Sequence, residues 1–377
     1  MGCEPELTEK KSRATKPRKL NLPKGVPPLT SLYLYIAGSC NLACRHCWIE
    51  PDYQESNRNG NFIKVSHLKK AIRQAKPLGL GSVKLTGGEP MLHPRFREII
   101  NYIESQKVGM FMETNGILID DKMARLLKAK KHFNFISVSL DGSKAATHDW
   151  MRGVKGSYKK AVSGIRSLVK AGFRPQIICT LHKGNVAELE DVVKLAQRLG
   201  CGSVKFNHVQ HMGRGDRFAE KNGFKVRELI SLFQKIETEI QPKSKVPVFF
   251  DIPVAFFPIK RFLKSNLPCC HVLNILGVLS SGDLSICGVG VTIPELNFGN
   301  LAKDDMGKVW ARSPKLKELR RFIPGKFEGV CGRCIHRFTC LGACIANNYH
   351  LKQKFNAPYY FCDQAFKQGL FPISRLT

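Results

Sequence analysis

Residues 32–51 read LYLYIAGSCNLACRHCWIEP, and this stretch decides the fold. Its first half is a short apolar run of the kind that forms a buried strand. Its second half holds the set Cys40-x3-Cys44-x2-Cys47. Three thiolates within so short a segment can hold three irons of a cubane cluster and leave the fourth iron open. The stretch therefore predicts an iron–sulfur site at the end of a strand.

The chain beyond this stretch alternates strand-like and helical patterns. Apolar runs of strand length occur at residues 32–37, 83–86, 110–113, 136–140, 176–181 and 204–209. Segments of helical period lie between them, at residues 65–75, 95–106, 122–129, 158–171 and 186–199. This alternation predicts an α/β fold, with a parallel sheet that closes wholly or partly as a barrel and helices on its outside.

Polar and glycine-rich motifs follow several of these predicted strands. They are Gly87-Gly88-Glu89-Pro90, Glu113-Thr114-Asn115-Gly116 and Asp141-Gly142, together with the first cysteine set. Folds of this kind carry their chemistry at the carboxyl ends of the strands. We therefore expect these motifs to meet in one site.

A second group of cysteines lies in the last third of the chain. It reads Cys270-x11-Gly282-x4-Cys287, then Cys331-x2-Cys334-x5-Cys340-x3-Cys344, then Cys362. Zinc could explain residues 331–344 alone, but it leaves the first cysteine set unexplained. No signal sequence precedes the cysteines, so metal ligation is favoured over disulfides and a cytoplasmic location is expected.

Composition sets limits on location and partners. The 377 residues are 43% apolar, with no run long enough to span a membrane. The net charge is +30, which favours acidic peptides, nucleic acid or carboxylated small molecules as partners. A basic, flexible arm is expected at residues 1–29, but it lacks interleaved aromatic residues, so nucleic-acid binding is not favoured.

The first cysteine set, with His46 before its last cysteine, resembles the signature of radical S-adenosylmethionine (radical SAM) enzymes. The resemblance implies a partial (β/α)6 TIM-like barrel. It also implies that Cys40, Cys44 and Cys47 hold a 4Fe-4S cluster whose open iron binds S-adenosylmethionine. Reductive cleavage of that cofactor would give a 5′-deoxyadenosyl radical, which abstracts hydrogen from the substrate. A flavodoxin or ferredoxin-type protein would donate the electron.

The same resemblance extends to the cofactor-binding residues. It places Gly87, Gly88 and Glu89 against the methionine ammonium, with close approach permitted by the absence of a Cβ. The ribose and carboxylate would face the side chains of Thr114, Asn115, Ser139, Asp141 and Arg152. The alternative for the first four of these side chains is that each caps an adjacent helix or turn.

The later cysteines resemble the SPASM extension found in part of this superfamily. The resemblance implies that one cluster is closed by Cys331, Cys334, Cys340 and Cys362, and that Cys270, Cys287 and Cys344 hold a second. Either Cys269 is the fourth ligand of that second cluster, or one of its irons is open. The expected divisions are a core barrel at 30–215, a connecting helix and linker at 216–265, and the SPASM domain at 266–377.

Three functions remain open. The resemblance favours a peptide or protein maturase that introduces a crosslink, an epimerisation or a side-chain oxidation, acting on an acidic substrate. A tetrapyrrole side-chain decarboxylase of haem biosynthesis is the alternative, and an iron–sulfur electron carrier is an alternative of another class. His208, His211 and Asp251 are candidate proton acceptors. Cys179 is either a buried apolar residue or a hydrogen-atom donor.

Overall fold

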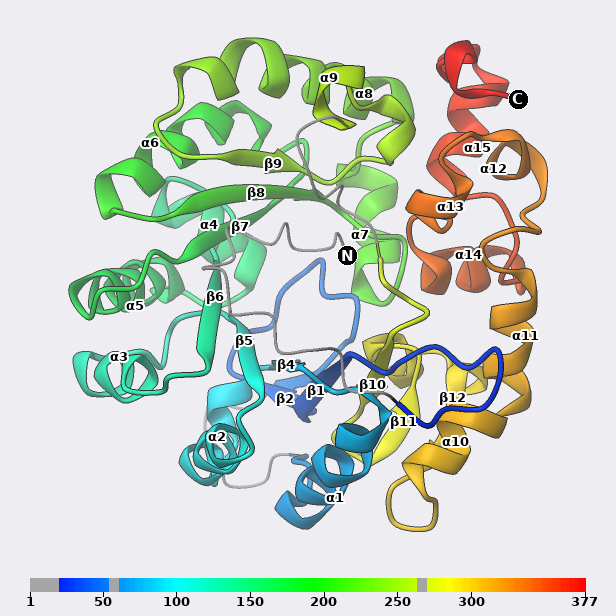
Figure 1. The fold of residues 1–377 in the computed structure, drawn as a ribbon. Helices are drawn as coiled ribbons and strands as arrows, with labels where there is room; N and C mark the ends of the chain where they lie inside the picture. The colour runs from blue at the N-terminus through cyan, green and yellow to red at the C-terminus, as the bar shows by residue number, and fades with distance from the viewer. Residues whose placement is uncertain (1–19, 54–60, 263–269) are drawn as a thin grey trace.

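The computed structural model describes residues 20–53, 61–262 and 270–377. Most of the predicted basic arm, and Cys269, lie outside these ranges. No helix among the described residues is long and apolar enough to cross a membrane. Figure 1 shows a curved sheet with helices around its outer face and a group of shorter helices beside it, formed by the C-terminal third of the chain.

A ten-stranded sheet forms the centre of the described chain. Six of its strands run parallel in chain order, and each is followed by an outer helix or helical segment. These strands are β1 (Ser31–Ala37), β4 (Ser82–Gly87), β5 (Gly109–Thr114), β6 (Phe133–Ser139), β7 (Gln176–Leu181) and β8 (Ser203–His208). β9 (Val248–Phe250) extends the sheet beyond β8, and β9 and β12 are its two edges, so the barrel is open.

The outer helices pack one apolar face on the sheet and turn a polar face to solvent. In α1 (Val65–Ala75) the buried residues are Val65, Leu68, Ala71, Ile72 and Ala75. This spacing of three and four residues is what an amphipathic helix requires. The other outer helices are α2 (Phe96–Ser105), α3 (Asp121–Lys128), α5 (Ser157–Lys170), α6 (Leu189–Leu199) and α8 (Val226–Lys235). Two further helices, α4 (Ala145–Arg152) and α7 (Arg214–Asn222), instead contribute Met151, Phe218 and Ala219 to a separate apolar cluster.

The cysteine-rich part of the chain continues the same sheet. β10 (Ile275–Val278) pairs in parallel with β1, in a register that sets Ser31 opposite Ile275. β11 (Asp283–Ser285) and β12 (Asn297–Asn300) then add in antiparallel fashion. Parallel strands buried on both faces read as continuous apolar runs, and β1 has this character.

Helices complete the C-terminal region and fasten it to the barrel. They are α9 (Ile259–Phe262), α10 (Met306–Arg312), α11 (Pro314–Phe322), α12 (Gly329–Arg333), α13 (Arg337–Cys340), α14 (Ile345–Lys352) and α15 (Tyr360–Lys367). Gln74 of α1 donates from Nε2 to Asp305 at 2.9 Å and accepts from the main-chain N–H of Met306 at 3.0 Å. The buried indole of Trp310 donates to the Pro27 carbonyl at 2.9 Å. The two parts therefore share packed, hydrogen-bonded contacts.

The predicted fold is confirmed. Each of the six predicted strands overlaps one of the parallel strands, and each predicted helix overlaps an outer helix. The sequence did not indicate α4 as a separate helix, because residues 145–152 carry only a short apolar face. It also did not indicate that β9 and β10 would lengthen the sheet at both ends.

Candidate active site

The first cysteine set lies in a loop that leaves β1 at the carboxyl end of the sheet. A short strand, β2 (Ser39–Cys40), pairs with β3 (Asp52–Tyr53) and fixes the start of this loop. Main-chain N–H groups of Ala43 and Arg45 donate to the carbonyls of Arg152 and Met151 at 3.1 and 3.0 Å. The loop is therefore clamped on the end of α4, and it presents the thiols of Cys40, Cys44 and Cys47 to one cavity.

This cavity lies at the carboxyl ends of the strands and is open to solvent, and its empty space of about 1430 Å³ includes part of that solvent. Most of the residues predicted for the site line it: Cys40, Cys44, His46, Cys47, Gly87, Gly88, Thr114, Asn115, Ser139, Arg152 and Cys270. Glu89 and Asp141 lie behind this lining, and both are fully buried. The structure thus brings the predicted motifs together, as parallel strands ending at one edge require.

The Gly87-Gly88 turn approaches the cysteine loop too closely for any side chain. Gly87 has φ +126°, a conformation that favours glycine, and a Cβ there would lie 2.4 Å from the Ala37 carbonyl oxygen. A Cβ on Gly88 would lie 2.0 Å from the Ser39 carbonyl oxygen and 3.1 Å from the Cβ of Cys40. The main-chain N–H of Glu89 donates to that same Ser39 carbonyl at 3.0 Å. The turn therefore supports Cys40 directly.

The carboxylate of Glu89 is held by hydrogen bonds from neighbouring residues of the protein. Its carboxylate accepts from Thr114 Oγ1 at 2.9 Å, from the Asn115 main-chain N–H at 2.8 Å and from the Met91 main-chain N–H at 3.2 Å. Burial raises the pKa of Glu89 to about 7, and these hydrogen bonds oppose the rise only in part. The side chain joins the turn after β4 to the end of β5.

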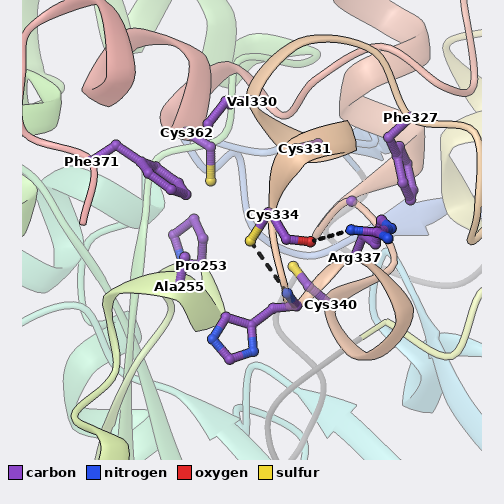
Figure 2. A pocket seen from close by; sticks show the side chains of 12 residues that line it. Pro253, Ala255, Phe327, Val330, Cys331, Cys334, Arg337, Cys340, Cys362 and Phe371 are labelled. Carbon is purple, nitrogen blue, oxygen red and sulfur yellow. Dashed lines mark hydrogen bonds between the residues drawn. The ribbon is translucent and has the colours of Figure 1, made fainter. Parts of the chain in front are cut away.

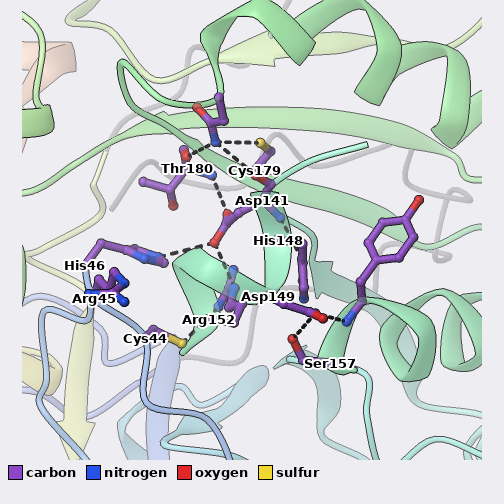
Figure 3. Close-up of polar contacts among 12 residues, drawn as sticks. Cys44, Arg45, His46, Asp141, His148, Asp149, Arg152, Ser157, Cys179 and Thr180 are labelled. Atoms are coloured by element: carbon purple, nitrogen blue, oxygen red, sulfur yellow. Dashed lines mark hydrogen bonds and ion pairs between the residues drawn. The ribbon is translucent and has the colours of Figure 1, made fainter. Parts of the chain in front are cut away.

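Asp141 is the centre of a buried polar network (Figure 3). It accepts from the Thr180 main-chain N–H at 2.8 Å, and its Oδ2 lies 2.8 Å from Arg152 Nε in an ion pair. Arg152 in turn donates from its guanidinium to Cys44 Sγ at 3.6 Å. His46 Nε2 lies 3.7 Å from the same Asp141 oxygen, but burial lowers the pKa of His46 to about 4, so this histidine is neutral near pH 7.

Two of the cavity thiols have the electrostatics expected of cluster ligands. Burial raises the pKa of both Cys40 and Cys44, neighbouring thiolates add to each rise, and Arg152 opposes the rise at Cys44 in part. Buried thiols this close together ionise readily only where further positive charge compensates them. The irons of a cluster supply that charge, and a coordinated thiol is deprotonated. The residues present therefore fit an iron–sulfur group.

A second cysteine set surrounds a separate small cavity in the C-terminal region (Figure 2). Cys331, Cys334, Cys340 and Cys362 all line it, in company with apolar side chains such as Phe327, Val330 and Phe371, and its empty space is about 330 Å³. Main-chain N–H groups of Tyr359 and His336 donate to the sulfurs of Cys331 and Cys334, each at 3.4 Å. Four thiols around one apolar space, with N–H donors to sulfur, fit a closed cubane cluster.

The remaining three cysteines of the extension are arranged differently. Cys270 lines the large cavity. Cys287 is buried, and its burial raises its pKa to about 12. A thiolate at the nearby Cys344 adds to that rise. Within the described ranges, no three Cys, His, Asp or Glu side chains converge on a point where a single metal ion would sit. The choice between Cys269 and an open iron stays a prediction, because Cys269 lies outside the described residues.

The candidate proton acceptors and the candidate hydrogen-atom donor lie at unequal distances from the cavity. His208 lines it, and burial lowers its pKa to about 4. Its Nδ1 lies 3.5 Å from the hydroxyl of Tyr360 on α15. His211 is more exposed and lies 3.6 Å from Asp216. Cys179 is buried on β7 between Ile178 and Thr180, which line the cavity, so alternation along the strand turns Cys179 to the helical layer.

Sequence reasoning missed two lysines in the cavity wall, Lys84 on β4 and Lys205 on β8. Lys84 Nζ lies 3.0 Å from the Glu113 carboxylate and 4.2 Å from the ring centre of Tyr33. Both lysines lower the pKa of Glu113 against the effect of burial. The sequence did contain a signal for them. A lysine within an otherwise apolar strand that is buried on both faces indicates a paired charge or a polar site.

Comparison with known proteins agrees with this geometry. A model of the radical SAM superfamily matches residues 34–196, and a model of the SPASM iron–sulfur cluster-binding domain matches residues 269–335. The AdoMet-dependent heme synthase of Methanosarcina barkeri is 27% identical over 330 residues, which cover 83% of this chain and 90% of that protein. The mycofactocin maturase MftC of Mycobacterium ulcerans is 26% identical over 333 residues, covering 87% of this chain and 86% of that protein.

A solved structure shares the fold. The crystal structure of Streptococcus suis SuiB bound to its precursor peptide SuiA superposes with a TM-score of 0.71 at 18% identity, covering 89% of this chain and 76% of that one. The open barrel, the cysteine trio at its strand ends and the cysteine-rich extension define a radical SAM enzyme with a SPASM domain. The chain belongs to that superfamily, whose cofactors are S-adenosylmethionine and iron–sulfur clusters.

Proposed function

We propose that this radical SAM/SPASM enzyme modifies a peptide or protein. The observation that carries the proposal is the cavity of about 1430 Å³, lined both by the cysteine trio and by Cys270 of the extension. The barrel and the extension therefore border one cavity that is open to solvent, through which a segment of a larger substrate can reach the cysteine trio. The similarity to the mycofactocin maturase supports the same substrate class.

Cys40, Cys44 and Cys47 are the proposed ligands of the radical-generating cluster. Around it, the proposed cofactor-binding residues are His46, Gly87, Gly88, Glu89, Thr114, Asn115, Ser139, Asp141 and Arg152. When bound, the cluster and S-adenosylmethionine supply a 5′-deoxyadenosyl radical that abstracts hydrogen from the substrate. The protein's part is to hold the thiolates, to shape the cavity through the Gly87-Gly88 turn and to exclude water with the buried walls of the barrel.

We further propose three 4Fe-4S clusters in all. Cys331, Cys334, Cys340 and Cys362 would close one auxiliary cluster, and Cys270, Cys287 and Cys344 would hold the other. The proposed divisions are a core barrel at 30–215, a connecting helix and linker at 216–265 and the SPASM domain at 266–377. Because cluster thiolates have to stay reduced, a cytoplasmic location and a flavodoxin or ferredoxin-type electron donor complete the proposal.

The expected substrate is acidic. The chain has a net charge of +30, and Lys84 and Lys205 lie in the cavity wall. A field of this sign attracts anionic segments and raises their local concentration. Because Glu113 also lines the cavity and pairs with Lys84 at 3.0 Å, the expected preference for an acidic substrate rests chiefly on the net charge of the whole chain.

A first experiment tests the radical chemistry. The protein is reconstituted with iron and sulfide under argon, reduced with dithionite and supplied with S-adenosylmethionine, and 5′-deoxyadenosine is measured. We expect the wild type to form it and a Cys40/Cys44/Cys47→Ala triple variant to form none. Formation of 5′-deoxyadenosine by the triple variant would refute the proposal. Absence of product from a cluster-loaded wild type would favour the electron-carrier alternative.

A second experiment tests the substrate class. The reduced enzyme is incubated with short peptides encoded beside its gene, and the products are analysed by mass spectrometry in H2O and in D2O. Loss of two hydrogens indicates a crosslink or oxidation, and uptake of one deuterium without other change indicates epimerisation. The second candidate is a tetrapyrrole decarboxylase, which the similarity to the Methanosarcina barkeri heme synthase favours. Release of CO2 from a propionate-bearing tetrapyrrole, with the peptides unchanged, would establish that candidate instead.

A further inference from the structure

The guanidinium of Arg152 lies between a carboxylate and a cysteine sulfur. Its Nε is 2.8 Å from Asp141 Oδ2, and its terminal nitrogen donates to Cys44 Sγ at 3.6 Å (Figure 3). Arg152 is 8% exposed and Asp141 is fully buried. A buried arginine is rarely found unless its charge is paired. Here the ion pair between Nε and Asp141 fixes the direction in which the terminal nitrogens of the planar guanidinium point.

The backbone holds this arrangement in place. Arg152 is the last residue of α4, and its carbonyl accepts from the Ala43 main-chain N–H at 3.1 Å. Gly153 follows with φ +72°, and a Cβ there would lie 2.5 Å from the Ala43 carbonyl oxygen. Asp141 is fixed in turn by the Thr180 main-chain N–H. The main chain at Arg152 is therefore fixed to the cysteine loop, and the Asp141 carboxylate is fixed to β7.

We propose that Arg152, positioned by Asp141, donates a hydrogen bond to the Cys44 thiolate and thereby raises the reduction potential of the cluster that this cysteine holds. The inference rests on the proposed function, because it takes Cys44 as a ligand of the radical-generating cluster. It assigns Arg152 to the sulfur, a role apart from the predicted contact with the carboxylate of S-adenosylmethionine.

The direction of the effect follows from charge. Reduction adds an electron to the cluster, and hydrogen bonds to its sulfurs are among the factors that set the potential. A fixed cation 3.6 Å from a ligand sulfur stabilises the more negative, reduced state. Asn115 Nδ2 also approaches a trio sulfur, that of Cys40, but at 3.9 Å, and it donates to Asn41 Oδ1 at 2.7 Å. Arg152 is therefore the stronger donor of the two.

The chain offers a matched control in Arg214. Its Nε donates to the main-chain carbonyl of Cys44 at 2.9 Å, so it places a second guanidinium beside the same residue. This contact is made to the carbonyl oxygen of Cys44 and leaves the sulfur to Arg152. Arg214→Gln removes a nearby charge while keeping the hydrogen bond from Arg152, and Arg152→Gln removes both a charge and the bond to sulfur.

The test is a redox titration of the reconstituted enzyme followed by electron paramagnetic resonance. The trio cluster is recognised as the signal that changes when S-adenosylmethionine is added. We expect Arg152→Gln to shift its midpoint potential to a more negative value, Arg152→Lys to shift it less, and Arg214→Gln, which keeps the hydrogen bond to sulfur, also to shift it less than Arg152→Gln. The signals of the auxiliary clusters should not move in any variant.

An unchanged midpoint in Arg152→Gln, or an equal shift in Arg214→Gln, would overturn the proposal. Iron content is measured in every sample. If Arg152→Gln does not load the cluster, Arg152→Lys is the deciding variant, and failure of both to load would assign Arg152 a structural role only. Failure of the proposed function would be seen separately, as a wild-type signal that does not respond to S-adenosylmethionine.

Discussion

The Glu89 carboxylate accepts a hydrogen bond from the main-chain N–H of Asn115 at 2.8 Å, which joins the glycine turn after β4 to the end of β5. Glu89 is fully buried, and Thr114 and Met91 supply its other donors. Because the same turn touches the loop that carries Cys40, this carboxylate contributes to the position of the cysteine trio.

Glu89 should make stability depend on pH. Burial raises its pKa to about 7, above the ordinary value of 4.5, so the folded state binds the proton more tightly than the unfolded state. Its contribution is fully present below the unfolded pKa and is lost as the pH rises through about 7, up to about 3 kcal/mol in total. Denaturant unfolding of wild type and Glu89→Gln between about pH 5.5 and 8.5 tests this. The wild type should lose stability relative to the variant as pH rises, and parallel curves would refute the assignment.

Gly88→Ala should displace the cysteine loop. Its new Cβ would lie 2.0 Å from the Ser39 carbonyl oxygen, a main-chain atom that cannot turn aside. We expect a loss of about 3 kcal/mol or more in the free energy of unfolding, and a fall in iron bound by the trio. Gly325→Ala is the control, because a Cβ there meets nothing within 4 Å, and it should change stability by no more than about 0.5 kcal/mol. Equal stability of the two variants would contradict the close approach.

The barrel could be predicted well because its strands and helices are encoded by patterns within short stretches of sequence. Apolar runs such as residues 32–37 mark strands by composition, and helical spacing such as that of Val65, Leu68 and Ile72 marks the outer layer. The convergence of the cysteine trio with the Gly87-Gly88 turn also followed, since parallel strands end at one edge. These predictions needed only the order and period of residues.

Contacts between distant segments were beyond such reasoning. Arg152 and Cys44 are 108 positions apart, and nothing near either residue signals that the guanidinium points to the sulfur. The pairing of β10 with β1 joins residues more than 240 positions apart, and short strands carry no mark of their partner. The lysines at positions 84 and 205 were visible, but their common cavity depends on the curvature of the sheet.

Asp149 should stabilise the connection between α4 and α5. Its carboxylate accepts from the Gly156 N–H at 2.6 Å, from Ser157 Oγ at 2.7 Å and from the Tyr158 N–H at 2.7 Å, and so satisfies the start of α5 (Figure 3). Asp149→Ala should lower the free energy of unfolding by about 2 kcal/mol. Asp191→Ala on α6 is the control, since Asp191 has only a 3.9 Å contact with Lys194, and it should change stability by about 0.5 kcal/mol or less. Chemical denaturation measures both, and equal values would argue against the capping role.

Cys340 and Cys201 test the closed auxiliary cluster, because burial raises the pKa of each thiol to about 12 and only their surroundings differ. Cys340 shares its cavity with the thiols of Cys331, Cys334 and Cys362, whereas Cys201 belongs to the apolar core and lines neither described cavity that contains cysteines. With three clusters, the wild type should hold about twelve irons per chain, and a Cys334/Cys340→Ala double variant should lose about four, because only two of the four thiolates remain. Cys201→Ala should keep the wild-type count. Iron and sulfide analysis after anaerobic reconstitution gives these numbers, and a wild-type count near four would leave the extension without clusters.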